Sequence, residues 1–364
     1  MSEAPPERPA GTGRRFYARV VEASSFAELA RAIERTDSDP EGVGIMTRKG
    51  RVFAVALRHV PLKASPLLKQ ELLAVGADAA HARGVADHSV ATSDVLLLAT
   101  WGQFRRLLPK LRRQPFQLQR LADEVESSLR HYVQRAPRPV EGVHRSFEVG
   151  GRTLVMGVVN VTPDSFSDGG RFIDPDRAID HARALIEEGA DLIDVGGEST
   201  RPGATPVDPE EEWRRIRPVI EALRSDPGVP VSVDTRRPDV ARRAFEAGAD
   251  VVNDVGGLAD PAMREVVRTA GAAAIAIHCR GTPETMMGLA TYGDVRSEVF
   301  EELARATDRA ESEGIPSSQL LVDPGLGFAK TGAQSLELLA HVGELRSLGY
   351  PVVVGASRKS FLGA

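Results

Sequence analysis

The stretch LVMGVVNVTPDSFSDGG, residues 154–170, contains an apolar run that ends at Asn160 and continues into hydroxyls, carboxylates and glycines. Short apolar runs bounded by turn residues predict buried strands. The same arrangement recurs further along the chain, in DLIDVGGESTRPG (191–203), VPVSVDTRRP (229–238), ADVVNDVGG (249–257), AAAIAIHCRGTP (272–283), LLVDPGLGFAKTG (320–332) and PVVVGASRKS (351–360). Repeated strands with polar groups at their carboxyl ends are typical of the active face of a barrel of parallel strands.

Helical patterns separate these strands, and proline marks where several of the helices begin. The patterns cover residues 174–188, 209–224, 238–247, 261–269, 296–313 and 333–347. Pro209, Pro238 and Pro261 are expected at first helical positions, with Asp208 and Asp260 as N-caps. Right-handed crossovers curl such a sheet toward closure, which predicts a TIM (β/α)8-type barrel. The competing fold, a doubly wound open sheet, usually carries a glycine fingerprint that is absent after Asn160.

Composition restricts the class of protein. The chain has 364 residues, 42% hydrophobic and 27% charged, which is ordinary globular usage and long enough for about two domains. One cysteine, Cys279, excludes an internal disulfide and predicts a reducing, cytoplasmic setting. Because no apolar run reaches about 18 residues, no membrane span is expected. The second part of the chain is acidic, which argues against nucleic acid as its ligand.

Four segments are expected along the chain. Residues 1–15 read as a disordered tail, 16–135 as a small α/β domain of unknown role, 136–144 as a linker and 145–364 as the barrel. Within the small domain we expect a strand over 14–23, a helix from Ser25, and a hairpin over 43–57 that turns at Lys49-Gly50. The basic segment 103–120 is expected to be a solvated surface, with a nucleic-acid or partner patch as the alternative.

Polar side chains at the strand ends are the candidate site. Asn160 is either a cap or a ligand to a hard cation or a phosphate oxygen. An arginine beside a hydroxyl, as in Thr200-Arg201, suits bidentate binding of phosphate or carboxylate. Asp234, Asn253 and Asp323 come from three strands and suit a heterocycle with both donors and acceptors, although each alone is also a plausible cap.

Other side chains near these strand ends have weaker interpretations. Lys359 is placed to offset the carboxylates, and Ser360 lies at a helix start that favours an anionic group. Phe328 is an apolar wall or simple core. His278 is more readily a satisfied core histidine than a catalytic one, and Cys279 is a small hydrophobic residue.

The motifs resemble those of one family. VNVTPDSFSDGG, GGESTRPGA, SVDT, VNDV, DPGLGFAK and GASRKS resemble dihydropteroate synthase, in the order and spacing of that family, over roughly residues 146–364. The resemblance implies a transferase of folate biosynthesis. It would condense 6-hydroxymethyl-7,8-dihydropterin diphosphate with 4-aminobenzoate, giving 7,8-dihydropteroate and diphosphate. Sulfonamides would mimic the aminobenzoate.

The resemblance also implies roles for residues, with Mg²⁺ as cofactor. The pterin would be held deep in the barrel by Asp234, Asn253, Val255, Asp323, Phe328, Gly355 and Lys359. Asn160 would meet Mg²⁺ and the diphosphate. The diphosphate and aminobenzoate would be met by the loops bearing Phe166, Asp168, Thr200, Arg201 and Pro202, and by Ser360.

The chain departs from the family pattern in places. Cys279 stands where methionine is frequent, and Ala329 where glycine is frequent; both predict small effects. The sequence ends at Ala364, before the eighth strand of the family barrel and its diphosphate-binding Arg and His. We therefore expect a fragment, or a chain impaired unless another segment supplies that strand.

Partners and rival functions follow from the same resemblance. Small-molecule substrates are expected, with no nucleic acid and no membrane, and family members commonly form homodimers. Two rival functions are a non-catalytic pterin-binding protein and another pterin-binding barrel, such as a methyltetrahydrofolate-dependent methyltransferase.

Overall fold

The computed structural model describes residues 21, 23, 25–134, 136–162, 174–199, 207–225, 228–282 and 285–363, without the side chain of Ser360. The chain divides into two compact units, Met1–Glu126 and Ser127–Ala364. The expected tail over 1–15 and most of the strand expected over 14–23 lie outside the described residues.

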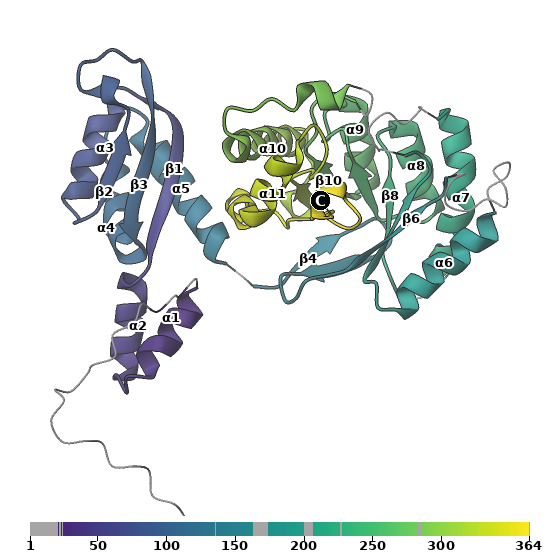
Figure 1. Ribbon diagram of the computed structural model, residues 1–364, viewed down its shortest axis with the longest axis horizontal. Helices are drawn as coiled ribbons and strands as arrows, with labels where there is room; N and C mark the ends of the chain where they lie inside the picture. The colour runs from purple at the N-terminus through teal and green to yellow at the C-terminus, as the bar shows by residue number, and fades with distance from the viewer. Residues whose placement is uncertain are drawn as a thin grey trace, which may run out of the picture. The chain divides into compact units, whose positions relative to one another are not determined.

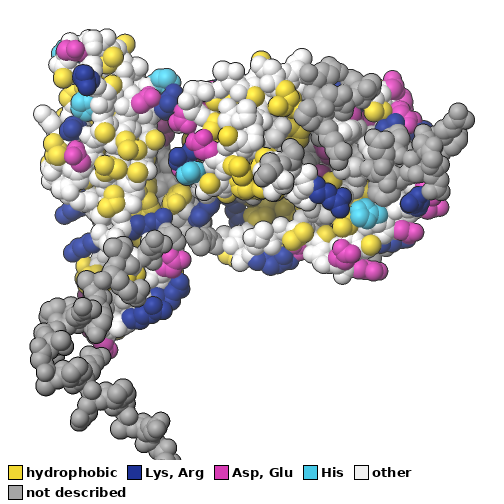
Figure 2. Space-filling model, viewed as in Figure 1, with side chains coloured by type: hydrophobic (Ala, Val, Ile, Leu, Met, Phe, Trp, Pro, Cys, Tyr) yellow, Lys and Arg dark blue, Asp and Glu magenta, His cyan; other side chains and the backbone are white. Residues whose placement is uncertain are grey.

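The first unit is a small antiparallel sheet with helices. Its elements in order are α1 (Phe26–Glu34), α2 (Pro40–Lys49), β1 (Val52–Pro61), α3 (Ala64–Leu73), β2 (Asp78–His81), the short 3-10 helix η1 (Arg83–Val85), β3 (Thr92–Thr100), α4 (Trp101–Leu111) and the start of α5 (Leu118–Val133). The sheet order is β1-β3-β2, and burial alternates along β3. One face is therefore packed, while Leu96 and Leu98 are exposed on the other, where Figure 2 shows hydrophobic side chains.

Helix α1 confirms one expectation in this unit, and α2 overturns another. The Ser25 side chain caps α1 by accepting from the Glu28 N–H at 3.2 Å. The hairpin expected at Lys49-Gly50 is wrong, because residues 40–49 form α2 and β1 pairs with β3 instead. The physical reason is local: the Asp39 side chain accepts from the first-turn amides of Glu41 and Gly42, in a helix that begins with proline, and proline is favoured at that position.

The second unit is built from parallel strands and the helices between them (Figure 1). The strands are β6 (Met156–Asn160), β7 (Leu192–Gly196), β8 (Val231–Asp234), β9 (Val251–Asp254), β10 (Ala273–Ile277) and β11 (Leu320–Asp323). The helices are α6 (Pro175–Glu187), α7 (Pro209–Ser225), α8 (Pro238–Ala247), α9 (Pro261–Ala270), α10 (Val295–Ser312) and α11 (Gly332–Ala340), with the 3-10 turns η2 (Met286–Leu289), η3 (Ser317–Gln319), η4 (Val342–Leu348) and η5 (Ser360–Leu362). Strand order follows chain order from β6 to β11, as in the expected (β/α) barrel.

The two faces of this sheet pack against different partners. Every residue of β7 and β10 is buried, as expected for parallel strands covered on both sides. Outward residues such as Val195 and Val233 pack with helix residues such as Ile216 and Val240. Inward residues of the sheet form a second cluster together with Val140 and Val255. Its buried members are Val140, Val251, Val255, Ala273, Ile275, Ile277 and Leu321. The interior is thus a separate apolar layer beneath the strand ends.

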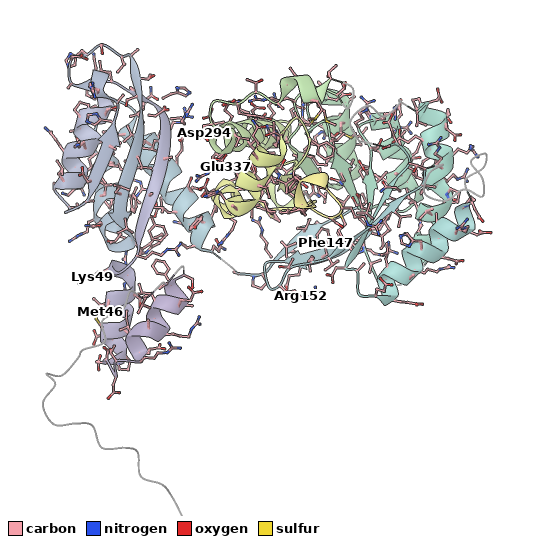
Figure 3. The ribbon with its side chains drawn as sticks, viewed as in Figure 1. Met46, Lys49, Phe147, Arg152, Asp294 and Glu337 are labelled. Atoms are coloured by element: carbon pink, nitrogen blue, oxygen red, sulfur yellow. The ribbon has the colours of Figure 1, made fainter. Side chains whose placement is uncertain are left out.

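The segment expected as a linker, 136–144, is part of the barrel unit. It contains β4 (Arg138–Glu141), which pairs with β5 (Ser146–Val149) in a hairpin. Phe147 of this hairpin, labelled in Figure 3, packs against the interior cluster. The turn is held because the buried carboxylate of Asp250 accepts from the backbone amides of His144 and Arg145, at 2.8 and 2.7 Å. Pro137 and Pro139 therefore lie at the start of a hairpin that packs against the interior cluster, and not in a linker.

The last expected strand and helix differ from expectation. Within residues 351–357, only Val352 forms a parallel bridge, to Val322 of β11. Pro351 offers no N–H to a ladder, and Gly355 weakens strand propensity, so pairing stays minimal. The helix expected over 333–347 is α11 followed by η4. Among the described residues, no helix has the length and apolarity needed to cross a membrane.

Candidate active site

Three polar residues and one glycine lie in register at the carboxyl ends of four neighbouring strands. Asn160 of β6 pairs in register with Gly196 of β7, Gly196 with Asp234 of β8, and Asp234 with Asn253 of β9. A Cβ at Gly196 would lie 3.3 Å from the Asn160 Oδ1 and 3.5 Å from the Asp234 Oδ2. Glycine at this position therefore leaves room between an amide oxygen and a carboxylate.

Asn253 is held by a carboxylate that the sequence analysis missed. Its Nδ2 donates to the Asp194 Oδ2 at 3.0 Å, and within the described structure its own Oδ1 is buried without a hydrogen-bond partner. An unpaired buried acceptor is costly unless a ligand donor meets it. Asp194, inside the apolar strand DLIDVG, was detectable as a charge in a fully buried run.

Burial penalises the ionised forms of two neighbouring carboxyl groups, those of Asp194 and Asp234. Burial raises the pKa of Asp194. Burial and the nearby Asp194 raise the pKa of Asp234 well above its ordinary value. Two carboxyl groups in one dry site resist double ionisation. A ligand that brings hydrogen-bond donors or developing positive charge would relieve both penalties.

Asp323 adds a third carboxyl group at the end of β11. It is buried, and its Oδ1 accepts from the Gly325 N–H at 2.6 Å. Burial raises its pKa to about 6, with Lys359 and Lys330 acting in the opposite direction. A Cβ at Gly355 would lie 4.0 Å from the Asp323 Oδ2, so this glycine adjoins the carboxylate.

Apolar and cationic side chains flank this carboxyl group. Val255 is buried in the interior cluster, and Phe328 is partly buried against the same cluster. The Lys359 Nζ lies 4.5 Å from the centre of the Phe328 ring and donates to the Leu326 carbonyl. The lysine is thereby fixed over an aromatic face, at cation–π distance. Burial lowers its pKa, opposed by Asp323.

Several of the predicted site residues are not among the residues that the structure describes. Phe166, Asp168, Thr200, Arg201 and Pro202, together with the side chain of Ser360, lie outside the described residues. The structure does describe what flanks residues 200–206. The Glu198 Oε1 accepts from the Val207 N–H at 2.9 Å, and Arg237 binds Glu198 with both terminal nitrogens, at 3.0 and 3.1 Å. Glu198 is thus bound both to Val207, which follows residues 200–206 in the chain, and to Arg237 at the start of α8.

His278 and Asp254 have structural roles. Asp254 accepts from the Gly256 and Leu258 amides at 2.7 and 2.8 Å. His278 is buried, with its Nε2 3.0 Å from the Glu302 Oε2 of α10, and burial lowers its pKa. Cys279 packs against the interior cluster, and burial raises the pKa of its thiol. These contacts favour the core interpretation of His278.

The residues present allow a divalent metal only a sparse set of protein ligands. No group of three or more His, Cys, Asp or Glu residues that could hold an ion occurs within the described ranges. Asn160 is exposed at the end of β6, with its amide oxygen beside the space left by Gly196. One protein oxygen fits Mg²⁺ when substrate phosphates and water supply the other ligands.

Comparison with known proteins identifies the family of this chain. The family profile described as pterin binding enzyme matches residues 156–364. A dihydropteroate synthase from Synechocystis is 46% identical over 228 residues, which are 62% of this chain and 79% of that protein. The chain belongs to the dihydropteroate synthase family.

Longer relatives match both units of the chain. A probable bifunctional folylpolyglutamate synthase/dihydropteroate synthase from Halobacterium salinarum is 42% identical over 344 residues, or 94% of this chain. The chain spans 41% of the length of that relative.

Solved dihydropteroate synthases share the barrel. The Xanthomonas albilineans enzyme with 4-aminobenzoic acid has a TM-score of 0.59 and 44% identity, covering 63% of this chain and 81% of that one. The same organism's enzyme in complex with 7,8-dihydropteroate has a TM-score of 0.56 and 41% identity, covering 62% of this chain and 80% of that one.

Ala329 allows a prediction on a departure from the family pattern. Its φ is +49°, in the left-handed region, and its side chain is fully buried. Replacing Ala329 by Gly removes about 1 kcal/mol of backbone strain but adds unfolded-state entropy and loses a buried methyl group. The free energy of unfolding should therefore change by less than about 1 kcal/mol. Thermal unfolding measures this, and a loss of several kcal/mol would contradict it.

Proposed function

We propose that this chain is a dihydropteroate synthase. It joins 4-aminobenzoate to 6-hydroxymethyl-7,8-dihydropterin diphosphate, and the products are 7,8-dihydropteroate and diphosphate. The observation that carries this proposal is the buried acceptor set of Asn253, Asp234 and Asp323, three strand ends facing one apolar interior. Such a set matches the donor-rich edge of an amino-pyrimidinone ring.

The pterin ring is the part of the substrate that the described residues fit best. Asp323 accepts from the amino and ring N–H groups, and Asn253 offers its unpaired Oδ1. Phe328 and Val255 contact the ring faces, and Lys359 donates to a ring oxygen or nitrogen. Pairing these groups with a ligand converts costly buried polar atoms into satisfied ones.

The chemistry needs charge stabilisation more than a base. The bond from the pterin methylene to the diphosphate breaks, and diphosphate takes the electron pair. The aniline nitrogen of 4-aminobenzoate then bonds to the methylene and releases its proton. The buried carboxyl groups of Asp234 and Asp194 favour positive charge developing on the ring and methylene. Because aniline is a weak base with a free electron pair, no activated nucleophile is required.

The diphosphate end is assigned to Asn160 and to the loops of Thr200 and Arg201. Mg²⁺, where bound, neutralises charge on the leaving diphosphate. Asn160 would supply one oxygen to that ion, and Arg201 with Thr200 would bind phosphate oxygens. Phe166, Asp168 and Pro202 would close over the aminobenzoate, and Ser360 would bind its carboxylate. Sulfonamides, which share the aniline of aminobenzoate, would compete there. The family resemblance also supports a homodimer, which sedimentation can test.

The proposal is tested by turnover. The purified 364-residue chain is given dihydropterin diphosphate and labelled 4-aminobenzoate, with Mg²⁺ or with EDTA, and dihydropteroate is separated and counted. Mg²⁺-dependent product supports the synthase. Binding of the pterin without product would instead favour the non-catalytic pterin-binding protein, and absence of both would reject the proposal.

Asn160 gives a sharper test of the metal assignment. We expect Asn160→Ala to weaken the apparent Mg²⁺ affinity and lower kcat/KM by about 10- to 100-fold, because one oxygen ligand is lost. Binding of 6-hydroxymethylpterin, which carries no diphosphate, should be unchanged. Calorimetry with that pterin is the control. An unchanged Mg²⁺ dependence of turnover would reject the role of Asn160.

A further inference from the structure

Lys330 is a buried lysine that the proposed chemistry leaves unused. Its residue is 2% exposed, at the end of the loop after β11. Its Nζ lies 2.8 Å from the His278 Nδ1, 3.2 Å from the His278 carbonyl oxygen, 3.1 Å from that of Gly325 and 2.9 Å from that of Phe328. One ammonium group therefore joins the end of β10 to both ends of the turn after β11.

The neighbours of Lys330 determine which acceptors its N–H groups bind. Glu302 is held ionised, because hydrogen bonds from His278 and Arg280 lower its pKa to about 2. The network assigns the His278 proton to Nε2, which donates to Glu302, so that Nδ1 accepts from Lys330. Four acceptors, the His278 Nδ1 and three carbonyl oxygens, surround the three N–H donors of a charged lysine, so one donor is shared between two of them. A neutral amine has only two N–H donors and would leave two of the four acceptors without one.

The turn held by Lys330 contacts three groups of the candidate site. The Gly325 N–H donates to Asp323, and the Leu326 carbonyl accepts from Lys359. The Phe328 ring lies against the interior cluster and under the Lys359 ammonium. A shift of residues 325–328 would therefore displace a carboxylate, a cation and an aromatic wall together.

We propose that Lys330 is a positioning residue for the pterin, acting by fixing the turn 325–328 through the carbonyl groups of Gly325 and Phe328. This inference rests on the proposed function. It assigns to Lys330 no contact with substrate; Lys330 acts through Asp323, Lys359 and Phe328. Misplacement of such groups by a fraction of an ångström is sufficient to weaken binding.

Stability alone does not account for a charged group at this position. Burial lowers the pKa of Lys330 to about 7, which reflects the cost of keeping its charge out of water. Methionine has a similar length and no such cost, although it leaves the carbonyl groups unpaired. The two effects oppose each other, so we expect Lys330→Met to alter the melting temperature little while the turn loosens.

The test compares three variants by calorimetric binding of 6-hydroxymethyl-7,8-dihydropterin diphosphate with Mg²⁺. Lys330→Met should bind at least about tenfold more weakly, and Lys330→Gln, which keeps two donors, about threefold. The KM for this substrate should rise accordingly, while the KM for 4-aminobenzoate stays within about twofold. Amide exchange at Gly325 and Phe328 should accelerate. If the methionine variant does not fold, the glutamine variant provides the same comparison.

Arg145→Met is the matched control. Arg145 donates to the Arg224 carbonyl and lies 3.6 Å from Asp250, beside the hairpin β4–β5. Its loss should affect unfolding but leave pterin affinity unchanged. If Lys330→Met binds the pterin diphosphate within twofold of the wild type, the inference is overturned and the proposed function stands. If the wild type itself does not bind, both fall together.

Discussion

Replacing Asp323 by Asn should abolish most activity and at the same time stabilise the protein at neutral pH. The carboxyl group is buried and accepts from the backbone N–H groups of Gly325 and Gly355, and its two oxygens have further lone pairs that can accept from a pterin. An amide presents one oxygen and two donors, and the donors oppose those of the pterin edge. Sites built to pair a substrate N–H lose large factors when that pairing fails, and we expect kcat/KM to fall about 1,000-fold or more.

The stability gain follows from the raised pKa of Asp323. Its pKa rises from 3.8 to about 6 on folding. Below pH 3.8 the group is protonated in both states and carries no penalty. Between pH 3.8 and 6 the unfolded chain releases its proton while the folded chain keeps it, so stability falls as pH rises. Above pH 6 the full penalty, about 3 kcal/mol, is present.

Thermal unfolding at two pH values checks this prediction. Without the ionisable group, Asp323→Asn should raise the melting temperature by about 8 °C at pH 7.5 and have little effect near pH 4. The control is Asp180→Asn, because this substitution is chemically identical and Asp180 is exposed on α6. A gain that does not depend on pH, or activity retained within tenfold, would contradict the assignment.

The parts of the fold that the sequence predicted are those set by local chemistry. Pro209, Pro238 and Pro261 begin α7, α8 and α9 as expected, because proline is favoured at the first turn of a helix. The expected aspartate caps, Asp208 and Asp260, bind first-turn amides of α7 and α9. The same signal, Asp39-Pro40, begins α2, where the turn residues Lys49-Gly50 led to the wrong expectation of a hairpin. Local capping was the more reliable signal.

The parts of the candidate site that the sequence missed depend on tertiary contacts. Asp234, Asn253 and Asp323 were named because they end strands, and parallel register then places strand ends side by side. Asp194 was missed because its partner Asn253 lies 59 residues away in the chain, and Lys330 because it is anchored to His278, 52 residues away. Nothing in the spacing of either residue specifies those partners. The available signal was a charge within an apolar strand for Asp194, and a lysine in the loop that follows β11 for Lys330.

We expect Gly325→Ala to lower the stability of the barrel unit more than the addition of a methyl group at any other described glycine near the site. Gly325 has a φ of +65°, and a Cβ there would lie 1.9 Å from the His278 carbonyl oxygen. Because that atom belongs to the backbone at the end of β10, it cannot move aside as a side chain would. The methyl group must displace the turn, and with it the N–H that binds Asp323.

Gly271→Ala separates this clash from backbone strain. Gly271 also has a φ of +65°, but nothing lies within 4 Å of its would-be Cβ. Gly271→Ala should lower the free energy of unfolding only by the strain of alanine in the left-handed region, about 1 kcal/mol, and it should leave pterin affinity unchanged. Gly325→Ala should cost about 4 kcal/mol or more, equivalent to a fall of about 10 °C in melting temperature, and lose pterin binding. Equal costs for the two variants would mean that the turn yields freely, and a freely yielding turn could not position Asp323. The pair therefore tests whether the contact between the ends of β10 and β11 is as rigid as the site requires.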